Sequence, residues 1–205
     1  MLVAEKILLK ELGRSEYQSA VDAMREFTAR RNSDTPDELW LLEHPPVYTL
    51  GLTADAAHGP KLDNGIPVVQ VERGGEITYH GPGQVVLYTL VDLARRGIKV
   101  KQFVAMLEQS VIDLLGDHAE RKPGAPGIYV GGAKVAALGI RVSRGCAFHG
   151  LALNVDMDLT PFSAIDPCGY PGLQVTQTRD LGIRESRETL GKRLAGILIG
   201  KLEHA

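Results

Sequence analysis

A glycine-rich segment, residues 73–84, constrains the fold of this chain more than any other stretch. It reads RGGEITYHGPGQ, so that four glycines and one proline flank a short β-type run, residues 77–79. Glycine has no Cβ, and its backbone can therefore adopt φ > 0 or approach a ligand closely. Glycine clusters mark turns more often than sites. The segment alone is compatible with two tight turns around a strand or with the wall of a binding site, to which Arg73, Glu76 and His80 would contribute.

Composition narrows the class of protein. The chain has 205 residues, 44% hydrophobic and 23% charged, as expected for one globular domain spanning residues 1–205. Aromatic residues make up only 5% and the formal net charge is −2, which argues against nucleic acid as the main partner. No apolar run approaches the roughly 20 residues that span a bilayer, and no signal peptide is recognised, so no membrane contact is expected. Two cysteines in a chain of this size indicate free thiols in a reducing cytoplasm.

Hydrophobic periodicity predicts three helices among many short strands. Helices are expected at residues 15–31, 99–115 and 186–202, the first opened by a capping box formed by Ser15 and Gln18. Strands are expected at residues 2–9, 38–43, 47–52, 68–71, 77–79, 84–93, 127–130, 134–142 and 146–155. Hairpins outnumber β-α-β units, so we predict an α+β fold with a mixed, largely antiparallel sheet and its helices on one side.

Three common motifs are absent from the sequence. There is no G-x-x-x-x-G-K-[ST] phosphate loop, no G-x-G-x-x-G that opens a helix after a strand, and no G-x-S-x-G nucleophile elbow. Neither a nucleotide cofactor nor a serine hydrolase of that type is expected.

Cys168 is the candidate nucleophile. It lies between Pro167 and Gly169 in a proline- and glycine-punctuated loop, residues 161–173, whereas Cys146 falls in a predicted strand and reads as core. A thiol with the reference pKa of about 8.5 is only slightly ionised at neutral pH, so it needs a neighbouring cation or base. Cys168 is either such a nucleophile or simply an exposed thiol.

The base could be Lys134, or a histidine. Lys134 opens the apolar run VAALGI after two glycines, and it is either a solvated strand end or a buried amine able to accept a proton. His149 or His80 could pair with Cys168 as thiol and imidazole. Cys146 and His149 have the C-x-x-H spacing of half a zinc site, but no second pair completes it, so no metal is expected.

The chain resembles the lipoate biosynthesis octanoyltransferases in four segments that occur in the family's order across about half of the chain. The segments are RGGEITYHGPGQVVLY (73–88), GGAKVAALGIRV (131–142), FHGLALNV (148–155) and DPCGYPGLQVTQ (166–177). The resemblance implies the fold of the biotin and lipoate protein ligases. It also implies that Cys168 carries the acyl group as a thioester and that Lys134 activates this thiol.

Three segments match those that line the acyl substrate in the family. Their residues are Arg73, Gly74, Gly75, Glu76, Ile77, Thr78, Tyr79, His80, Ala137, Leu138, Gly139, His149, Gly150, Leu151 and Ala152.

The resemblance implies octanoyl-acyl carrier protein as donor and, as acceptors, the lipoyl domains of 2-oxoacid dehydrogenase E2 subunits and the glycine cleavage H protein. No cofactor is implied, because the donor is already a thioester. Because acyl carrier proteins are acidic, we expect a basic patch at the entrance, with Arg73, Lys134, Arg141 and Arg144 as candidates. Three alternatives remain open: a ligase of the same fold that adenylates a free acid, a non-catalytic acyl- or partner-binding module, and a thiol hydrolase that uses Cys168 and His149.

Overall fold

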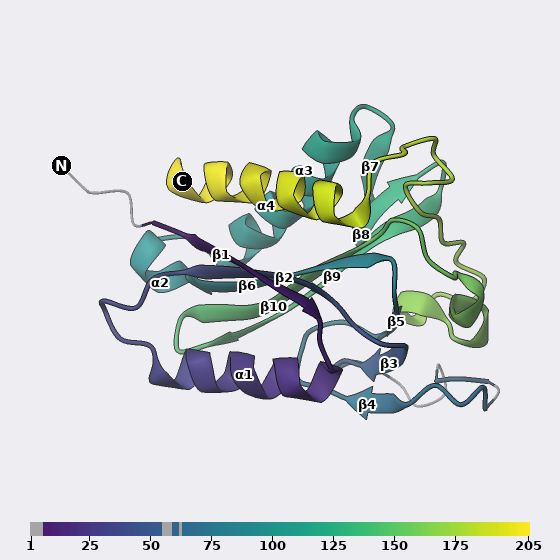
Figure 1. The fold of residues 1–205 in the computed structure, drawn as a ribbon, viewed down its shortest axis with the longest axis horizontal. Helices are drawn as coiled ribbons and strands as arrows, with labels where there is room; N and C mark the ends of the chain where they lie inside the picture. Colours follow the sequence, from purple (N-terminus) through teal and green to yellow (C-terminus); the bar gives the residue numbers. More distant parts are fainter. Residues whose placement is uncertain (1–5, 55–58, 62) are drawn as a thin grey trace.

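Two sheets form the framework of the protein. The computed structural model describes residues 6–54, 59–61 and 63–205. The larger, seven-stranded sheet (Figure 1) has the order β1 (Leu8–Arg14), β2 (Glu38–Glu43), β6 (Gln84–Asp92), β10 (Cys146–Asn154), β9 (Ala133–Ser143), β8 (Ala125–Val130) and β7 (Ala119–Lys122). The smaller has the order β4 (Val68–Gln70), β3 (Val47–Leu50) and β5 (Ile77–His80). Among the strands of the described part of the chain, only β1–β2 and β3–β4 pair in parallel, so the prediction of a mixed, largely antiparallel α+β fold is confirmed.

Helices cover both faces of the large sheet (Figure 1). Helices α3 (Val100–Leu115) and α4 (Arg187–Glu203) pack on one face around Phe103, Leu107 and Leu194, whereas α1 (Tyr17–Arg30) covers the other through Val21 and Met24. The prediction of helices on one side was wrong. Helices lie on both faces because every residue of β2 and β10 is buried, and a strand that is buried on both faces needs a covering layer on each face.

Several element boundaries differ from the predicted ones. The first strand begins at Leu8 rather than residue 2, and residues 2–5 of the prediction lie outside the described part of the chain. The capping box is also wrong: Glu16 is the N-cap of α1, the Ser15 hydroxyl bonds to the Leu12 carbonyl, and the Gln18 amide bonds to Asp22. Strand β7 and the single-turn helix α2 (Leu93–Arg96) were not predicted.

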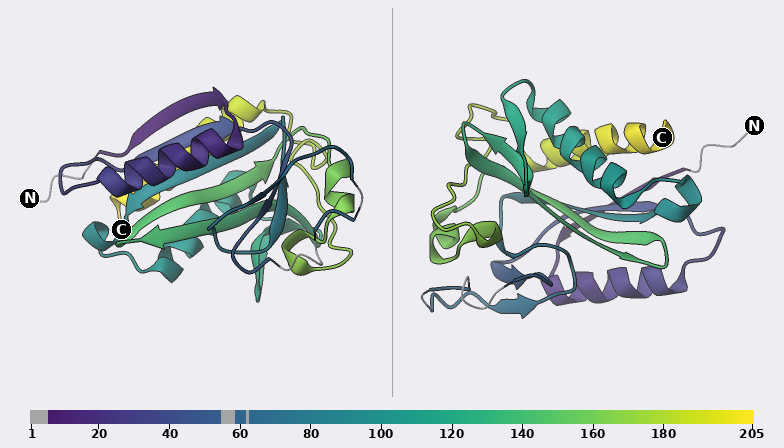
Figure 2. Two further views of the ribbon diagram at one scale, coloured as in Figure 1. Left: turned by 90° about the horizontal axis from the view of Figure 1, so that it is seen from below. Right: turned by 180° about the vertical axis from the view of Figure 1, so that it is seen from behind.

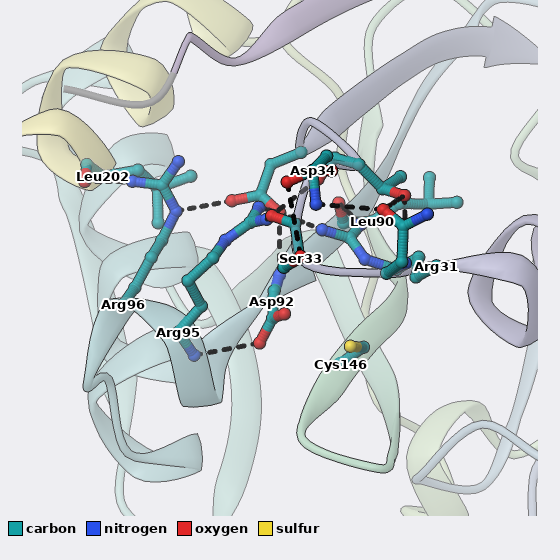
Figure 3. Close-up of polar contacts among 12 residues, drawn as sticks. Arg31, Ser33, Asp34, Leu90, Asp92, Arg95, Arg96, Cys146 and Leu202 are labelled. Atoms are coloured by element: carbon teal, nitrogen blue, oxygen red, sulfur yellow. Dashed lines mark hydrogen bonds and ion pairs between the residues drawn. The ribbon is translucent and has the colours of Figure 1, made fainter. Parts of the chain in front are cut away.

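A buried ion cluster ties several elements together near the start of β10 (Figure 3). Asp37, which is fully buried, accepts from the guanidinium groups of Arg31, Arg95 and Arg96, and from the backbone N–H of Asp92. The arginines also bind carbonyls at the end of β6, in the loop before β2 and at the end of α4. This arrangement neutralises Asp37 and fixes the relative positions of these segments.

The small sheet lies beside the loops that follow β10 (Figure 2). Two short 3-10 helices, η2 (Thr160–Ala164) and η3 (Pro167–Gly169), contact β5. A separate apolar cluster that includes Tyr48, Tyr79 and Phe162 fills the space between them. The glycine-rich segment, residues 73–84, contains β5 of the small sheet and leads directly into β6 of the large sheet, so it connects the two sheets.

Candidate active site

A cavity of about 430 Å³ opens between the glycine-rich segment, β9, β10 and α3. Its rim is exposed at Thr53, Gly75, Gly124, Pro126 and Tyr170, and its interior is mostly apolar. The lining consists of Tyr17, Thr53, Arg73, Gly74, Gly75, Glu76, Ile77, Thr78, His80, Val86, Tyr88, Val104, Leu107, Gly124, Pro126, Ala137, Leu138, Gly139, Ile140, His149, Gly150, Leu151, Ala152 and Tyr170. Such a space suits a small molecule with a substantial apolar part.

Close backbone contact explains the glycines of the wall. The Gly74 N–H donates to the Ile140 carbonyl at 2.9 Å, which fastens the glycine-rich segment to β9. A Cβ at Gly139 would lie 2.7 Å from the Gly74 carbonyl oxygen, closer than such atoms approach one another. Glycine is therefore required at residue 139, and the segment forms the wall of a cavity in addition to its turns.

Arg73, which is part of the lining, stabilises this wall through hydrogen bonds. Its side chain is 8% exposed, and the guanidinium donates to the backbone carbonyl and hydroxyl of Thr49 and to the Gly74 carbonyl. The charge is thus committed to hydrogen bonds inside the protein.

Lys134 is buried near one end of the cavity. The pairing of β8 with β9 shifts register between Ile128 and Tyr129, and Lys134, which pairs with Tyr129, lies next to this irregularity. Lys134 as a whole is only 3% exposed. Its Nζ donates to the Pro126 carbonyl at 2.9 Å and lies 5.2 Å from the centre of the Tyr129 ring. Of the two interpretations of Lys134, the solvated strand end is excluded.

Cys168 lies in η3, and its side chain is outside what the structure describes. Contacts of the neighbouring residues show where the backbone of η3 lies. Pro167 and Lys134 line the same small internal void of about 10 Å³, and the backbone of Lys134 bonds to residues 174 and 176 of the loop that follows η3. On the other side, a Cβ at Gly169 would lie 3.3 Å from Glu76 Cγ. The segment that carries Cys168 therefore packs between Lys134 and the cavity wall.

Another part of the lining contains the buried residues His80 and Tyr88, and His44 contacts both of them from outside the lining. His44 Nδ1 donates to the Ser15 carbonyl, so Nε2 accepts from the Tyr88 hydroxyl, both at 2.7 Å. His80 Nδ1 lies 2.8 Å from Gln84 Oε1. Burial lowers the pKa of His44 to about 4, and burial together with the neighbouring His44 lowers the pKa of His80 to about 3. Both imidazoles are neutral at pH 7.

His149, in β10, has an unusual backbone conformation for a strand residue. Its φ is +61°, unusual for a residue other than glycine, and its side chain lines the cavity with 1% exposure. Neither ring nitrogen has a hydrogen-bond partner among the described residues. Burial lowers its pKa to about 4, against the opposing field of Glu72.

The structure brings together the predicted segments. Every residue predicted to line the substrate lies in the cavity wall except Tyr79, whose ring packs instead against Tyr48 and Phe162. Tyr79 alternates with Thr78 and His80 along β5, and therefore faces away from the cavity. Sequence reasoning missed Val104 and Leu107 of α3 as wall residues, because their helical spacing is that of ordinary core residues.

The expected basic patch does not include all four of its candidates. Arg73 and Lys134 are buried, and Arg144 donates to carbonyls at the end of α1, so of the four candidates for a basic patch only Arg141 is exposed without such a bond. Cys146 is buried in β10, as predicted for a core cysteine, and no cluster of potential metal ligands occurs within the described ranges. None of the helices there combines the length and apolarity that crossing a bilayer requires.

The fold is that of the lipoate protein ligases. It combines a mixed sheet with a partly apolar cavity, which is closed by a glycine-rich segment and bordered by a buried lysine. A bipartite lipoate protein ligase solved with its E2 lipoyl domain, from Thermoplasma acidophilum, superposes with a TM-score of 0.76 over 97% of this chain and 84% of that one, at 16% identity. The chain belongs to the lipoyl protein ligase A/B catalytic domain family, whose model matches residues 16–193.

Two relatives are much closer in sequence. An octanoyltransferase from Azoarcus sp. (strain BH72) is 56% identical over 94% of this chain and 86% of the relative. Another octanoyltransferase, from Dechloromonas aromatica (strain RCB), is 54% identical over 96% of this chain and 97% of the relative.

Proposed function

We propose that the protein is an octanoyltransferase that moves an octanoyl group from acyl carrier protein to the ε-amine of a lysine on lipoyl-domain proteins, through a thioester on Cys168. The observation that carries this proposal is the buried amine of Lys134 beside the segment that holds Cys168, next to a partly apolar cavity. The identity to octanoyltransferases over nearly the whole chain supports it further.

In the first half-reaction Lys134, as the neutral amine, takes the proton of the Cys168 thiol. The thiolate attacks the carbonyl carbon of the donor thioester, and the bond from this carbon to the phosphopantetheine sulfur breaks. The leaving thiolate takes a proton from the Lys134 ammonium, which restores the amine. The Lys134 bond to the Pro126 carbonyl keeps Nζ in place during this exchange.

In the second half-reaction the acceptor lysine, as a free amine, attacks the octanoyl-Cys168 carbonyl. An amide bond forms, the carbon–sulfur bond to Cys168 breaks, and the proton of the amine passes through Lys134 to the released thiolate. No nucleotide is consumed, because the energy of the amide bond comes from a thioester.

The mostly apolar lining suits the octanoyl tail. Each methylene removed from water contributes about 0.8 kcal/mol. Discrimination by one methylene in such a cavity is only about 1–3 kcal/mol, so we expect a graded preference for chain length.

The partners that fit are an acyl carrier protein as donor and lipoyl domains, including those of E2 subunits and the glycine cleavage H protein, as acceptors. A reducing cytoplasm suits a mechanism that depends on a free thiol. Arg141, exposed next to the cavity residue Ile140, is the candidate contact for an acidic donor protein.

Intact-mass measurement after mixing with octanoyl-acyl carrier protein tests the proposal. We expect a single octanoyl adduct that maps to Cys168, is absent in Cys168→Ala, persists in Cys146→Ala, and disappears when a lipoyl domain is added. An adduct on Cys146 would refute the assignment of the nucleophile. Modification of the lipoyl domain from octanoate and ATP, without any thioester donor, would identify a ligase instead, and release of free octanoate without acceptor would identify a hydrolase.

A further inference from the structure

The peptide group between Pro126 and Gly127 is held from both of its ends. Its carbonyl oxygen accepts from Lys134 Nζ at 2.9 Å, and its N–H donates to Glu108 Oε1 of α3 at 3.4 Å. Glu108 is 9% exposed and is itself fixed by Arg121, whose Nε donates to Oε2 at 2.9 Å. A carboxylate thus holds and polarises the peptide whose oxygen receives the lysine amine, and polarisation of this kind strengthens hydrogen bonds in series.

Gly127 leaves the space that the lysine side chain fills. A Cβ at this position would lie 2.9 Å from Lys134 Cε, 3.1 Å from Lys134 Nζ and 2.8 Å from the Ala136 carbonyl oxygen. The contact with the Ala136 carbonyl oxygen is with backbone, so β8 and β9 must shift slightly, and the contacts with Cε and Nζ push the flexible end of the lysine aside. A side chain at residue 127 therefore moves the amine away from the Pro126 carbonyl, and the φ of +132° also favours glycine.

From these contacts we infer that Gly127 and Glu108 are positioning residues that hold the amine of Lys134 for the acyl transfer, a role that rests on the proposed function. Neither residue lines the cavity. Glu108 acts through the peptide and Gly127 acts through the absence of a side chain. The sequence alone gives no signal for Glu108, which has the spacing of a residue at the edge of a helix core.

The test is the single-turnover rate at which octanoyl-acyl carrier protein acylates Cys168, followed by quenching and intact mass over a range of donor concentrations. The variants are Lys134→Ala, Gly127→Ala, Glu108→Ala and Glu108→Gln. Gly131→Ala is the matched control, because Gly131 also has positive φ, at +57°, but a Cβ there would meet nothing within 4 Å.

Misplacing a catalytic group by about 1 Å can slow a reaction roughly 10²-fold, so we expect Gly127→Ala to lower the saturated rate by about that factor. The donor concentration at half-saturation should stay within about twofold of wild type, because the cavity wall is unchanged. Glu108→Ala should also slow acylation, whereas Glu108→Gln, which keeps an acceptor oxygen, should recover most of the rate. Gly131→Ala should react like wild type.

Equal rates for Gly127→Ala and Gly131→Ala, with Lys134→Ala slow, would overturn the inference and leave the proposed function intact. A wild-type rate for Lys134→Ala would instead remove the role proposed for the lysine, and the inference with it. Thermal denaturation identifies variants that do not fold. If Gly127→Ala does not fold, the two Glu108 variants decide. Slow acylation in Glu108→Ala with a largely recovered rate in Glu108→Gln supports the positioning role, whereas equal acylation rates in the two variants refute it.

Discussion

Among the described histidines, His44, His80 and His149 are buried, and they should make the protein lose stability in mild acid. Take His149, whose pKa is lowered by burial from its usual value of 6.5 to about 4. Above pH 6.5 neither the folded nor the unfolded chain protonates this imidazole, so it contributes no pH dependence. Between pH 6.5 and about 4 the unfolded chain binds a proton that the folded chain excludes, and the free energy of unfolding falls as the pH falls.

Between pH 7 and pH 5 the free energy of unfolding falls only below pH 6.5, that is, over about 1.5 pH units. Each unit is worth about 1.36 kcal/mol, so His149 lowers the free energy of unfolding by about 2 kcal/mol. His44 and His80, also buried and neutral, add losses of similar size. The total is comparable with the whole stability of many domains, about 5–15 kcal/mol.

Urea denaturation at pH 7 and pH 5 measures this difference directly. In His149→Asn the difference between the two pH values should shrink by about 2 kcal/mol, because asparagine tolerates the positive φ and does not titrate. His118→Gln, which removes an exposed imidazole, is the matched control variant. A difference in His149→Asn equal to that of wild type would show that His149 is not kept neutral by its burial.

Three further changes test other parts of the structure. Asp37→Asn should lower the free energy of unfolding by about 3–5 kcal/mol, because it leaves buried guanidinium groups uncompensated; the same substitution at exposed Asp22 should change urea denaturation by less than about 1 kcal/mol. Val104→Phe should fill part of the cavity and shift kcat/KM from octanoyl toward hexanoyl donors, measured as a ratio of the two. Arg141→Glu should raise the KM for octanoyl-acyl carrier protein but not for octanoyl-pantetheine, and an equal effect on both donors would contradict a docking role.

Most strands and helices were predictable because each follows from local periodicity. The strand Glu38–Glu43 was predicted with its observed bounds, and α3 began one residue later than expected. The position of α1 on the opposite face from α3 and α4 could not be predicted in this way. It depends on which strands become central in the sheet, and that is decided by pairing between β2, β6 and β10, which are far apart in sequence.

The predicted substrate-lining segments converge on one cavity, yet two kinds of information were missing from the sequence. Side chains alternate along β5, so Tyr79 faces away from Thr78 and His80, but which of these two faces borders the cavity cannot be read from the sequence. Whether Lys134 is buried depends on the β8–β9 irregularity and on the loop that follows η3. Neither of these can be read from the residues around Lys134.

The distribution of charge in the cavity follows from these placements. An apolar acyl tail gains nothing from ionised groups beside it, and burial keeps the lining residues His80 and His149, and the adjacent His44, neutral at pH 7. The cation of Arg73 is directed into carbonyl and hydroxyl acceptors within the wall. Lys134 is different because it borders the segment of Cys168, where the proposed mechanism requires the transfer of a proton. Changes that introduce charge among the histidines should therefore weaken acyl binding, whereas changes around Pro126 and Lys134 should slow the chemical step.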